Sequence, residues 1–249
     1  MGKNFERLDS VEVDATPEQV WQAIATGPGI DSWFLGRNEV DADAGVVRQS
    51  FAGYEPAHRV TAWDPPHKFS YRSDDPDGRT VAYEFLIEGR DRSSTVLRMA
   101  SSAFLPGDDW AAEYEAMTNG GALIFATLAT YLSHFAGRTA RPLTVFGPLT
   151  PDWPRARAAL LRALGLSPSP AAGDRVDVPV DGIGRIDGEV FFVNDQTVGV
   201  RTQDALYRFM RGFHGPIVAG HHLFGQADLG AANHAWQAWL DTTFSGRNR

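Results

Sequence analysis

Residues 16–34 read TPEQVWQAIATGPGIDSWF, and this stretch predicts two short helices that meet at a bend. Thr16 with Gln19 three residues later forms a capping box, and Pro17 occupies the first helical position, where its missing N–H costs nothing. Gly27-Pro28-Gly29 is expected to end the first helix before another helical turn begins over residues 30–34, which contain a Trp-Phe pair. Two short helices at a bend need a large apolar surface to pack against.

The residues on either side of this stretch favour strands. The expected strands span residues 5–13, 46–51, 58–63, 68–72, 80–88 and 94–101, and turn clusters such as Asp64-Pro65-Pro66 separate them. Within residues 80–88, Val81, Tyr83, Phe85 and Ile87 alternate with mostly polar side chains. The pattern predicts an antiparallel meander with one covered face and one exposed face.

A long helix is expected from about Trp110 to Phe135, with Asp108 or Asp109 as its N-cap. Apolar residues and one glycine recur along it at helical spacing: Tyr114, Met117, Gly121, Ile124, Leu128, Leu132 and Phe135. At about 1.5 Å per residue such a helix is roughly 35–40 Å long, enough to cross a whole sheet. Gly120-Gly121 in its middle indicates close backbone approach, a kink, or space left for another group.

The second half of the chain repeats this order of elements with a shorter sheet. After a linker at 137–142, a strand is expected at 143–146, a helix start at Thr150-Pro151, and a helix over 155–166. Strands at 176–180, 189–193, 197–201, 206–210 and 218–224 precede a last helix at about 231–244. The repeated order indicates a degenerate internal duplication, with one domain at 1–138 and a second, smaller one at 139–249.

Several short motifs follow one another in the first half in a characteristic order. They are V-x-A-T-P-E-x-V-W at 13–21, S-W-F at 32–34, W-D-P-P-H-K-F at 63–69, V-A-Y-E-F at 81–85 and T-V-L-R-M at 95–99. With the long helix they cover roughly residues 5–136, and this part resembles the START-like (SRPBCC) superfamily. Within that superfamily it is most similar to the bacterial proteins named after the activator of the ninety-kilodalton heat-shock protein's ATPase.

The resemblance implies an α+β, helix-grip fold, in which a curved antiparallel sheet wraps around a long C-terminal helix. In such a fold the two short helices at 16–34 would close one end of the sheet and pack on the long helix. The second half lacks these motifs, so its description as a second, shortened α+β unit of similar plan rests on element order alone.

The resemblance also implies that an apolar or amphipathic small molecule is held between helix and sheet, in a concave and mostly apolar site. The expected lining residues are large apolar or aromatic side chains: Trp33, Trp63, Tyr71, Tyr83, Phe85, Trp110, Tyr114 and Met117. Alternatively, these side chains fill a core, and the chain is a protein-interaction module.

Catalysis is a further alternative, because some relatives are cyclases, dehydratases or hydrolases. The polar residues that could take part here are Tyr71, Tyr83, Glu84 and His58. No spacing fixes their roles, so the catalytic residues stay unassigned and binding without turnover is the primary hypothesis.

Four histidines in the second half, His214, His221, His222 and His234, raise the question of a metal ion. Adjacent strand residues point to opposite faces, so His221 and His222 cannot share one site without a bend. We predict no metal ion and no other cofactor. The glycine-rich residues 182–188 resemble a phosphate loop only superficially and are expected to form a hairpin turn.

The composition, 43% hydrophobic and 22% charged over 249 residues, is typical of a globular protein. Cysteine is absent, which excludes disulfides and thiolate chemistry and fits a cytoplasmic protein. No apolar run approaches the ~20 residues of a membrane span.

Residues 1–138 carry 12 basic and 21 acidic side chains, a net charge of −9, and should repel nucleic acid. Whether the chain forms a homo-oligomer is left open.

Overall fold

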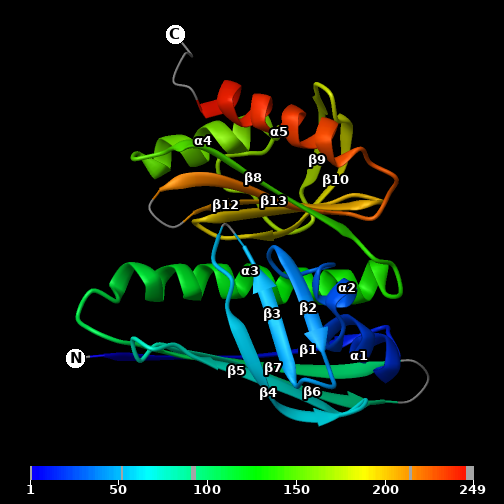
Figure 1. The fold of residues 1–249 in the computed structure, drawn as a ribbon. Helices are drawn as coiled ribbons and strands as arrows, with labels where there is room; N and C mark the ends of the chain where they lie inside the picture. Colours follow the sequence, from blue (N-terminus) through cyan, green and yellow to red (C-terminus); the bar gives the residue numbers. More distant parts are fainter. Residues whose placement is uncertain (1, 52, 91–93, 213–214, 245–249) are drawn as a thin grey trace. The chain divides into compact units, whose positions relative to one another are not determined.

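The computed structural model describes residues 2–51, 53–90, 94–212 and 215–244. The chain divides into two compact units, Met1–Ala140 and Arg141–Arg249. Each unit contains one antiparallel sheet, of seven and six strands respectively, together with helices (Figure 1). Among the described residues, no helix combines the length and the apolar character that crossing a lipid bilayer requires.

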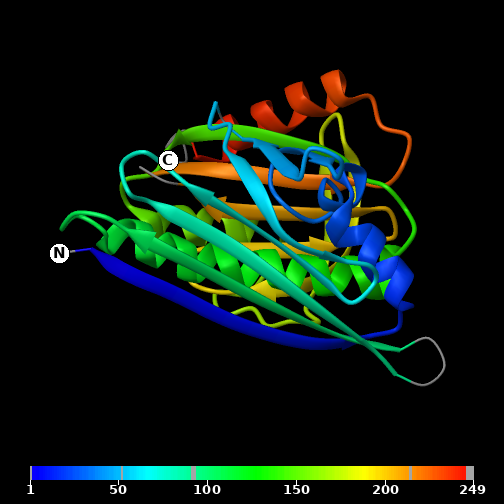
Figure 2. The ribbon, with the colours of Figure 1, turned by 60° about the horizontal axis from the view of Figure 1, so that its bottom comes forward.

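The first unit is a seven-stranded meander covered by one long helix. Its elements are β1 (Lys3–Val13), α1 (Pro17–Ala25), α2 (Gly27–Ile30), β2 (Arg37–Asp41), β3 (Val46–Ser50), β4 (Ala57–Asp64), β5 (Lys68–Asp74), β6 (Thr80–Gly89), β7 (Thr95–Leu105) and α3 (Ala111–Phe135). The strand order is β1-β7-β6-β5-β4-β3-β2. In Figures 1 and 2, α3 runs along one face of this sheet, which confirms the expected helix-grip arrangement.

The predicted capping box at the start of α1 is confirmed. The Thr16 hydroxyl accepts from the Gln19 backbone N–H at 3.3 Å, and the Gln19 side-chain oxygen accepts from the Thr16 backbone N–H at 2.9 Å. The expected role of Gly27-Pro28-Gly29 is wrong, because these residues begin α2 and do not simply break α1. The break lies at Thr26, whose extended backbone ends α1 and whose hydroxyl accepts from the Gly29 N–H at 3.1 Å.

Glycine is required at position 29 for a steric reason. A Cβ atom there would lie 2.0 Å from the Gln22 carbonyl oxygen and 2.8 Å from that of Ala23, so any larger residue would collide with the backbone of α1. The sequence stretch therefore produces two helices in direct contact, with a proline in the first turn of each.

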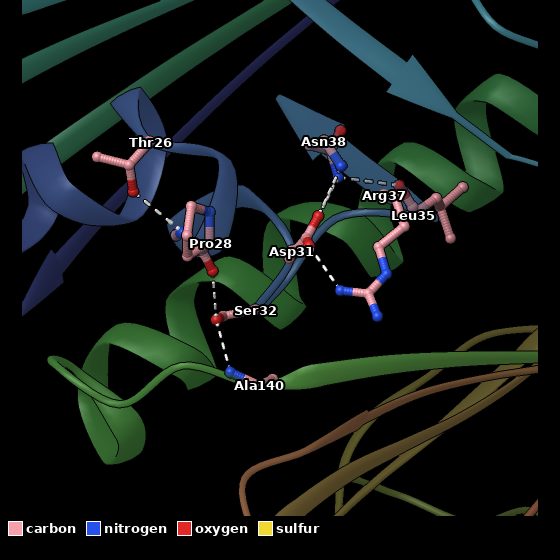
Figure 3. A network of polar contacts seen from close by, with 9 residues as sticks. Thr26, Pro28, Asp31, Ser32, Leu35, Arg37, Asn38 and Ala140 are labelled. Carbon is pink, nitrogen blue, oxygen red and sulfur yellow. Dashed lines mark hydrogen bonds and ion pairs between the residues drawn. The ribbon is translucent and has the colours of Figure 1, made fainter. Parts of the chain in front are cut away.

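A polar network holds α2 against β2 and against the end of the first unit (Figure 3). The buried Asp31 carboxylate accepts from the backbone N–H of Asn38 at 2.7 Å and from its side-chain amide at 3.1 Å, and it pairs with Arg37. The Ser32 hydroxyl donates to the Pro28 carbonyl at 2.8 Å and accepts from the Ala140 N–H at 2.9 Å. β2 itself was not anticipated from the sequence, since its residues, RNEVD, are mostly polar.

The long helix α3 spans the expected residues, but its start differs from the prediction. The N-cap is Trp110, which has a helical backbone and makes no side-chain capping bond. The expectation that Asp108 or Asp109 caps the helix is therefore wrong: both lie outside the position from which a side chain reaches the first free N–H groups. The helix continues through Gly120-Gly121, and a Cβ at Gly121 would lie 3.3 Å from Cδ of Arg7 on β1.

The second unit repeats the plan with fewer elements. They are β8 (Arg141–Leu149), α4 (Trp153–Ala163), β9 (Arg175–Val180), β10 (Gly184–Val193), β11 (Thr197–Arg201), β12 (Ala205–Arg211), β13 (Pro216–Leu223) and α5 (Leu229–Phe244). The strand order β8-β13-β12-β11-β10-β9 again pairs the first strand with the last and joins the others as a meander. One sheet face packs on α5 through the fully buried Trp236 and Leu240.

Several boundaries in this unit differ from the predictions. β8 begins at Arg141, inside the expected linker. Asp152 caps α4, its carboxylate accepting from the Arg155 N–H at 3.1 Å, whereas the Thr150 hydroxyl donates to the Gly215 carbonyl and so is not the cap. Only residues 181–183 form the hairpin turn, because β10 already begins at Gly184 and pairs there with Val180.

Candidate functional site

The side chains expected to line a ligand site lie at separate places in the first unit. Trp33 and Phe85 are fully buried with ring centroids 6.2 Å apart, and Phe69 stacks on Phe85 at 6.4 Å. Trp63 is 40% exposed and packs against Trp21 at 5.1 Å. At this end of the sheet the aromatic rings lie directly on one another and form core.

A second group lies at the start of α3. Trp110, Tyr114 and Met117 are partly buried and pack against a small cluster that contains Phe5 and Leu105. The Tyr114 and Phe5 rings meet edge to face at 5.5 Å. This contact shows that Phe5, near the start of β1, lies on the sheet face that α3 covers.

Tyr71 and Tyr83 lie between these two groups and belong to a row of polar residues across the sheet. Strand register places Arg7 opposite Ser101, Ser101 opposite Tyr83, and Tyr83 opposite Tyr71. Residues two positions away on the same strands are mainly apolar, including Phe5, Ala103 and Val81 on one side and Met99 and Phe85 on the other. A polar row thus crosses an otherwise largely apolar face beneath α3.

At one end of the row, Arg7 forms an ion pair with Asp9 on the same face. The guanidinium donates from Nε and from a terminal nitrogen to the two carboxylate oxygens, at 2.7 and 2.6 Å. The Arg7 stem contacts α3 where Gly121 leaves room for it. This pair was not anticipated from the sequence, although the i and i+2 spacing of Arg7 and Asp9 within a strand is a signal that both share a face.

At the other end of the row, His58 lies against both tyrosines. Its ring centroid is 5.4 Å from that of Tyr71 and 6.5 Å from that of Tyr83. The Nε2 atom of His58 is 2.9 Å from the side-chain oxygen of Gln49, so the neutral ring carries its proton on Nε2 and leaves Nδ1 as an acceptor. Burial lowers the pKa of His58 to about 4, and the ring is therefore neutral at pH 7.

The cluster contains buried polar atoms that have no hydrogen-bond partner among the described residues. They are Nδ1 of His58, the hydroxyl of Tyr71, the hydroxyl of Ser73 and the side-chain nitrogen of Gln49. Burial raises the pKa of Tyr71 well above its usual value and that of Tyr83 to about 12, so both phenols stay protonated. Gln49 and Ser73 were not anticipated from the sequence, because single polar residues in a strand carry no distinctive signal.

Glu84 is separated from this cluster by the pleat of the sheet. It alternates to the opposite face from Tyr83 and pairs with Lys68 at 2.6 Å. Of the polar candidates, the structure therefore brings together His58, Tyr71 and Tyr83 and excludes Glu84.

The histidines of the second unit do not gather. His221 and His222 are buried neighbours on β13, whereas His234 is exposed on α5 with its ring bonded to the Gly230 carbonyl. His214 lies outside the described residues. Within the described ranges, no three histidine, aspartate or glutamate side chains are close enough together to hold a metal ion.

Comparisons with known proteins match the first unit to a family. Residues 14–133 match the family described as Activator of Hsp90 ATPase homolog 1-like protein. No curated protein matches the chain.

Several solved structures are also similar to the chain. The Aha1 dimer from Colwellia psychrerythraea is 20% identical over 52% of this chain and 96% of its own, with a TM-score of 0.41. Bacillus halodurans protein BH1534 is 22% identical over 52% of this chain and 97% of its own, with a TM-score of 0.44. DynU16, from the dynemicin biosynthetic locus, is 18% identical and covers 96% of both chains, with a TM-score of 0.41.

Proposed function

Because residues 14–133 match the family described as Activator of Hsp90 ATPase homolog 1-like protein, we propose that the first unit binds an apolar or amphipathic small molecule between its sheet and α3. The observation that carries the proposal is the polar row beneath α3, where buried hydroxyl and imidazole atoms have no hydrogen-bond partner among the described residues. Buried polar groups in folded proteins are nearly always hydrogen-bonded, so unpartnered ones concentrated at one place call for a missing partner.

The hydrogen-bonding capacity of the row specifies one end of the ligand. Nδ1 of the neutral His58 ring can only accept a hydrogen bond, whereas the Tyr71 and Tyr83 hydroxyls can donate one. A hydroxyl or enol group on the ligand satisfies both requirements at once. The apolar residues on either side, such as Phe85 and Val81, suit an aromatic or alicyclic body.

A paired-probe experiment on the full chain tests the proposal. We expect 2-naphthol to raise the thermal unfolding midpoint and to add its mass to the protein in native mass spectrometry. Naphthalene, which lacks the hydroxyl, should bind about fivefold or more weakly, because one hydrogen bond contributes about 1 kcal/mol.

Two variants locate the effect. Tyr71→Phe should remove the preference for 2-naphthol over naphthalene. Tyr54→Phe, which removes a phenol hydroxyl from a side chain that is 54% exposed, should leave the preference intact. Absence of binding across a broad panel of lipids and aromatic compounds would contradict the proposal. It would favour the alternative, an interaction module whose core is filled by its own side chains, as it is around the fully buried Trp33 and Phe85.

The convergence of His58, Tyr71 and Tyr83 favours a second candidate function, a cyclase or hydrolase reaction at the same row. In that reaction Nδ1 of His58 would take a proton from the substrate while a tyrosine donates one to a carbonyl oxygen. The measurement is turnover of the bound compound, followed by mass spectrometry of the product. His58→Gln should abolish turnover without unfolding the protein; binding with no product after prolonged incubation argues for binding alone.

The site as proposed needs no metal ion or nucleotide, since its chemistry is supplied by neutral hydrogen-bonding side chains. We also propose a cytoplasmic location, which the absence of cysteine from the sequence supports.

A further inference from the structure

The second unit has a pocket at the start of α5 that is independent of the site proposed above. Its volume is about 350 Å³, within the range of pockets that take small molecules. The β9–β10 turn, β12, the segment after β13 and α5 contribute its walls. The residues that matter for recognition are Asp204, Tyr207, Asp228 and Trp236.

Trp236 brings an unused donor to this pocket. Its side chain is fully buried and its indole N–H has no acceptor among the described residues. The ring lies against Tyr207 at 5.4 Å, and the Tyr207 hydroxyl makes no hydrogen bond within the part of the chain that the structure describes, although the residue is only 9% exposed. Two residues that line one pocket therefore carry hydrogen-bonding groups without partners among the described residues.

His221, whose ring contacts that of Trp236, adds a second buried hydrogen-bond donor. The ring centroids of His221 and Trp236 are 4.4 Å apart. The backbone N–H of Arg208 donates to Nδ1 of His221 at 3.2 Å, so the neutral imidazole carries its proton on Nε2, which has no acceptor among the described residues. The N–H groups of Trp236 and His221 thus both lack an acceptor among the described residues, and an oxygen atom brought in through the pocket is the complement that they require.

The rim of the pocket has the opposite character. Asp204 and Asp228 are exposed carboxylates, and none of the described residues that line the pocket is basic. Asp228 already uses one oxygen to cap α5, accepting from the N–H groups of Gly230 and Ala231, and Asp204 accepts from the Thr202 hydroxyl. Neither carboxylate forms an ion pair within the described ranges, so the rim attracts a cation and repels an anion.

We propose that this pocket is a binding site for small molecules that carry both a carbonyl oxygen and an ammonium group, with the carbonyl facing Trp236 and the ammonium group facing Asp204 and Asp228. Amino amides and amino ketones have this chemistry. The site is distinct from the one beneath α3, because every residue of the pocket belongs to the second unit.

Three probes of similar size separate the two contributions in titrations of the full chain. Phenylalaninamide has both groups, 3-phenylpropanamide lacks the ammonium group, and 2-phenylethylamine lacks the carbonyl. We expect phenylalaninamide to bind about fivefold or more tightly than either of the others, as one added hydrogen bond or exposed charge pair predicts. In a two-dimensional ¹H–¹⁵N spectrum the indole N–H resonance of Trp236, assigned from Trp236→Phe, should shift with both amides.

A matched pair of variants tests the rim. The double substitution Asp204→Asn and Asp228→Asn should weaken the binding of phenylalaninamide and 2-phenylethylamine about fivefold and leave the binding of 3-phenylpropanamide unchanged. The cap of α5 is kept, because asparagine is also a good N-cap residue. Asp177→Asn with Asp187→Asn removes the same charge from exposed ion pairs on the β9–β10 hairpin and should change none of the affinities. The proposal would be overturned if the three probes bound with equal affinity or if the rim variant left all the affinities unchanged. It would also be overturned if the probes bound without shifting the Trp236 resonance.

Discussion

Tyr71 shows how a single buried hydroxyl connects stability with binding. The side chain is 1% exposed and packs against His58, Phe69 and Tyr83, yet its hydroxyl has no partner among the described residues. An unsatisfied buried hydroxyl costs about 1–3 kcal/mol, which the fold tolerates only where something else makes use of it.

The first prediction follows from this cost. Without added ligand, Tyr71→Phe should raise the free energy of unfolding by about 1 kcal/mol, because it removes the unpaired polar atom and keeps the ring. Phe85→Ala, in the same buried layer, should lower it by about 3–5 kcal/mol through loss of packing. Urea unfolding followed by circular dichroism measures both. A large destabilisation by Tyr71→Phe would mean that the hydroxyl has a partner after all.

His58 gives the second prediction, a dependence of stability on pH. In the folded protein its pKa is about 4, against 6.5 for an unperturbed histidine, so between these values the unfolded chain binds more protons than the folded one. The contribution of His58 is therefore fully present above about pH 6.5 and is lost as the pH falls towards 4.

Unfolding measured at pH 7 and pH 5 checks this sign. Between pH 7 and pH 5, the free energy of unfolding of the wild type should fall by about 1–2 kcal/mol more than that of His58→Gln. His221, whose pKa is lowered to about 3 by burial and by nearby Arg208, contributes in the same direction to both proteins and so cancels in the comparison. An identical loss in the two proteins would show that His58 titrates normally.

At the scale of elements, α3 and β1 fit together through a glycine. Gly121 faces the Arg7 stem, whereas a Cβ at Gly120 would meet no atom within 4 Å. Both residues weaken the helix to the same extent by conformational entropy, but only Gly121 leaves room for a neighbouring strand.

This difference yields a prediction with a built-in control. Gly120→Ala should stabilise the protein by about 0.5–1 kcal/mol, because alanine favours the helix and enters open space. Gly121→Ala should stabilise the protein less than Gly120→Ala or destabilise it, since its Cβ would press on Cδ of Arg7 and disturb the ion pair with Asp9. Thermal unfolding of the two variants provides the comparison, and an equal gain for both would contradict the proposed contact.

For the molecule as a whole, the organising fact is that each unit completes its own sheet. β1 closes against β7 in the first unit and β8 against β13 in the second, so among the described residues neither sheet takes a strand from the other unit. Each sheet also has its own covering helix, α3 in one and α5 in the other.

We therefore predict that residues 1–140 fold alone. The fragment should give dispersed amide resonances and a cooperative thermal transition, because its sheet and covering helix are complete. A fragment of residues 1–109, which lacks α3, should not fold, since the apolar sheet face around Met99 and Phe85 would be left in water. An unfolded 1–140 fragment would argue against two independent domains.

The sequence by itself determined the elements whose signals are local. The Thr16 capping box, the extent of α3 and the alternation of Val81, Tyr83, Phe85 and Ile87 all depend on residues within a few positions of one another. The order of these elements, with the family resemblance of residues 5–136, was enough to predict an antiparallel sheet gripping a long helix.

Only the tertiary structure decided which polar residues meet. Arg7, Ser101, Tyr83 and Tyr71 are far apart in the sequence, and strand register alone brings them into one row beneath α3. The role of Gly29 and the donors around Trp236 likewise depend on atoms from distant segments. Register and close packing arise from long-range pairing, in which a shift of one residue turns a side chain to the other face, and local sequence patterns do not encode it.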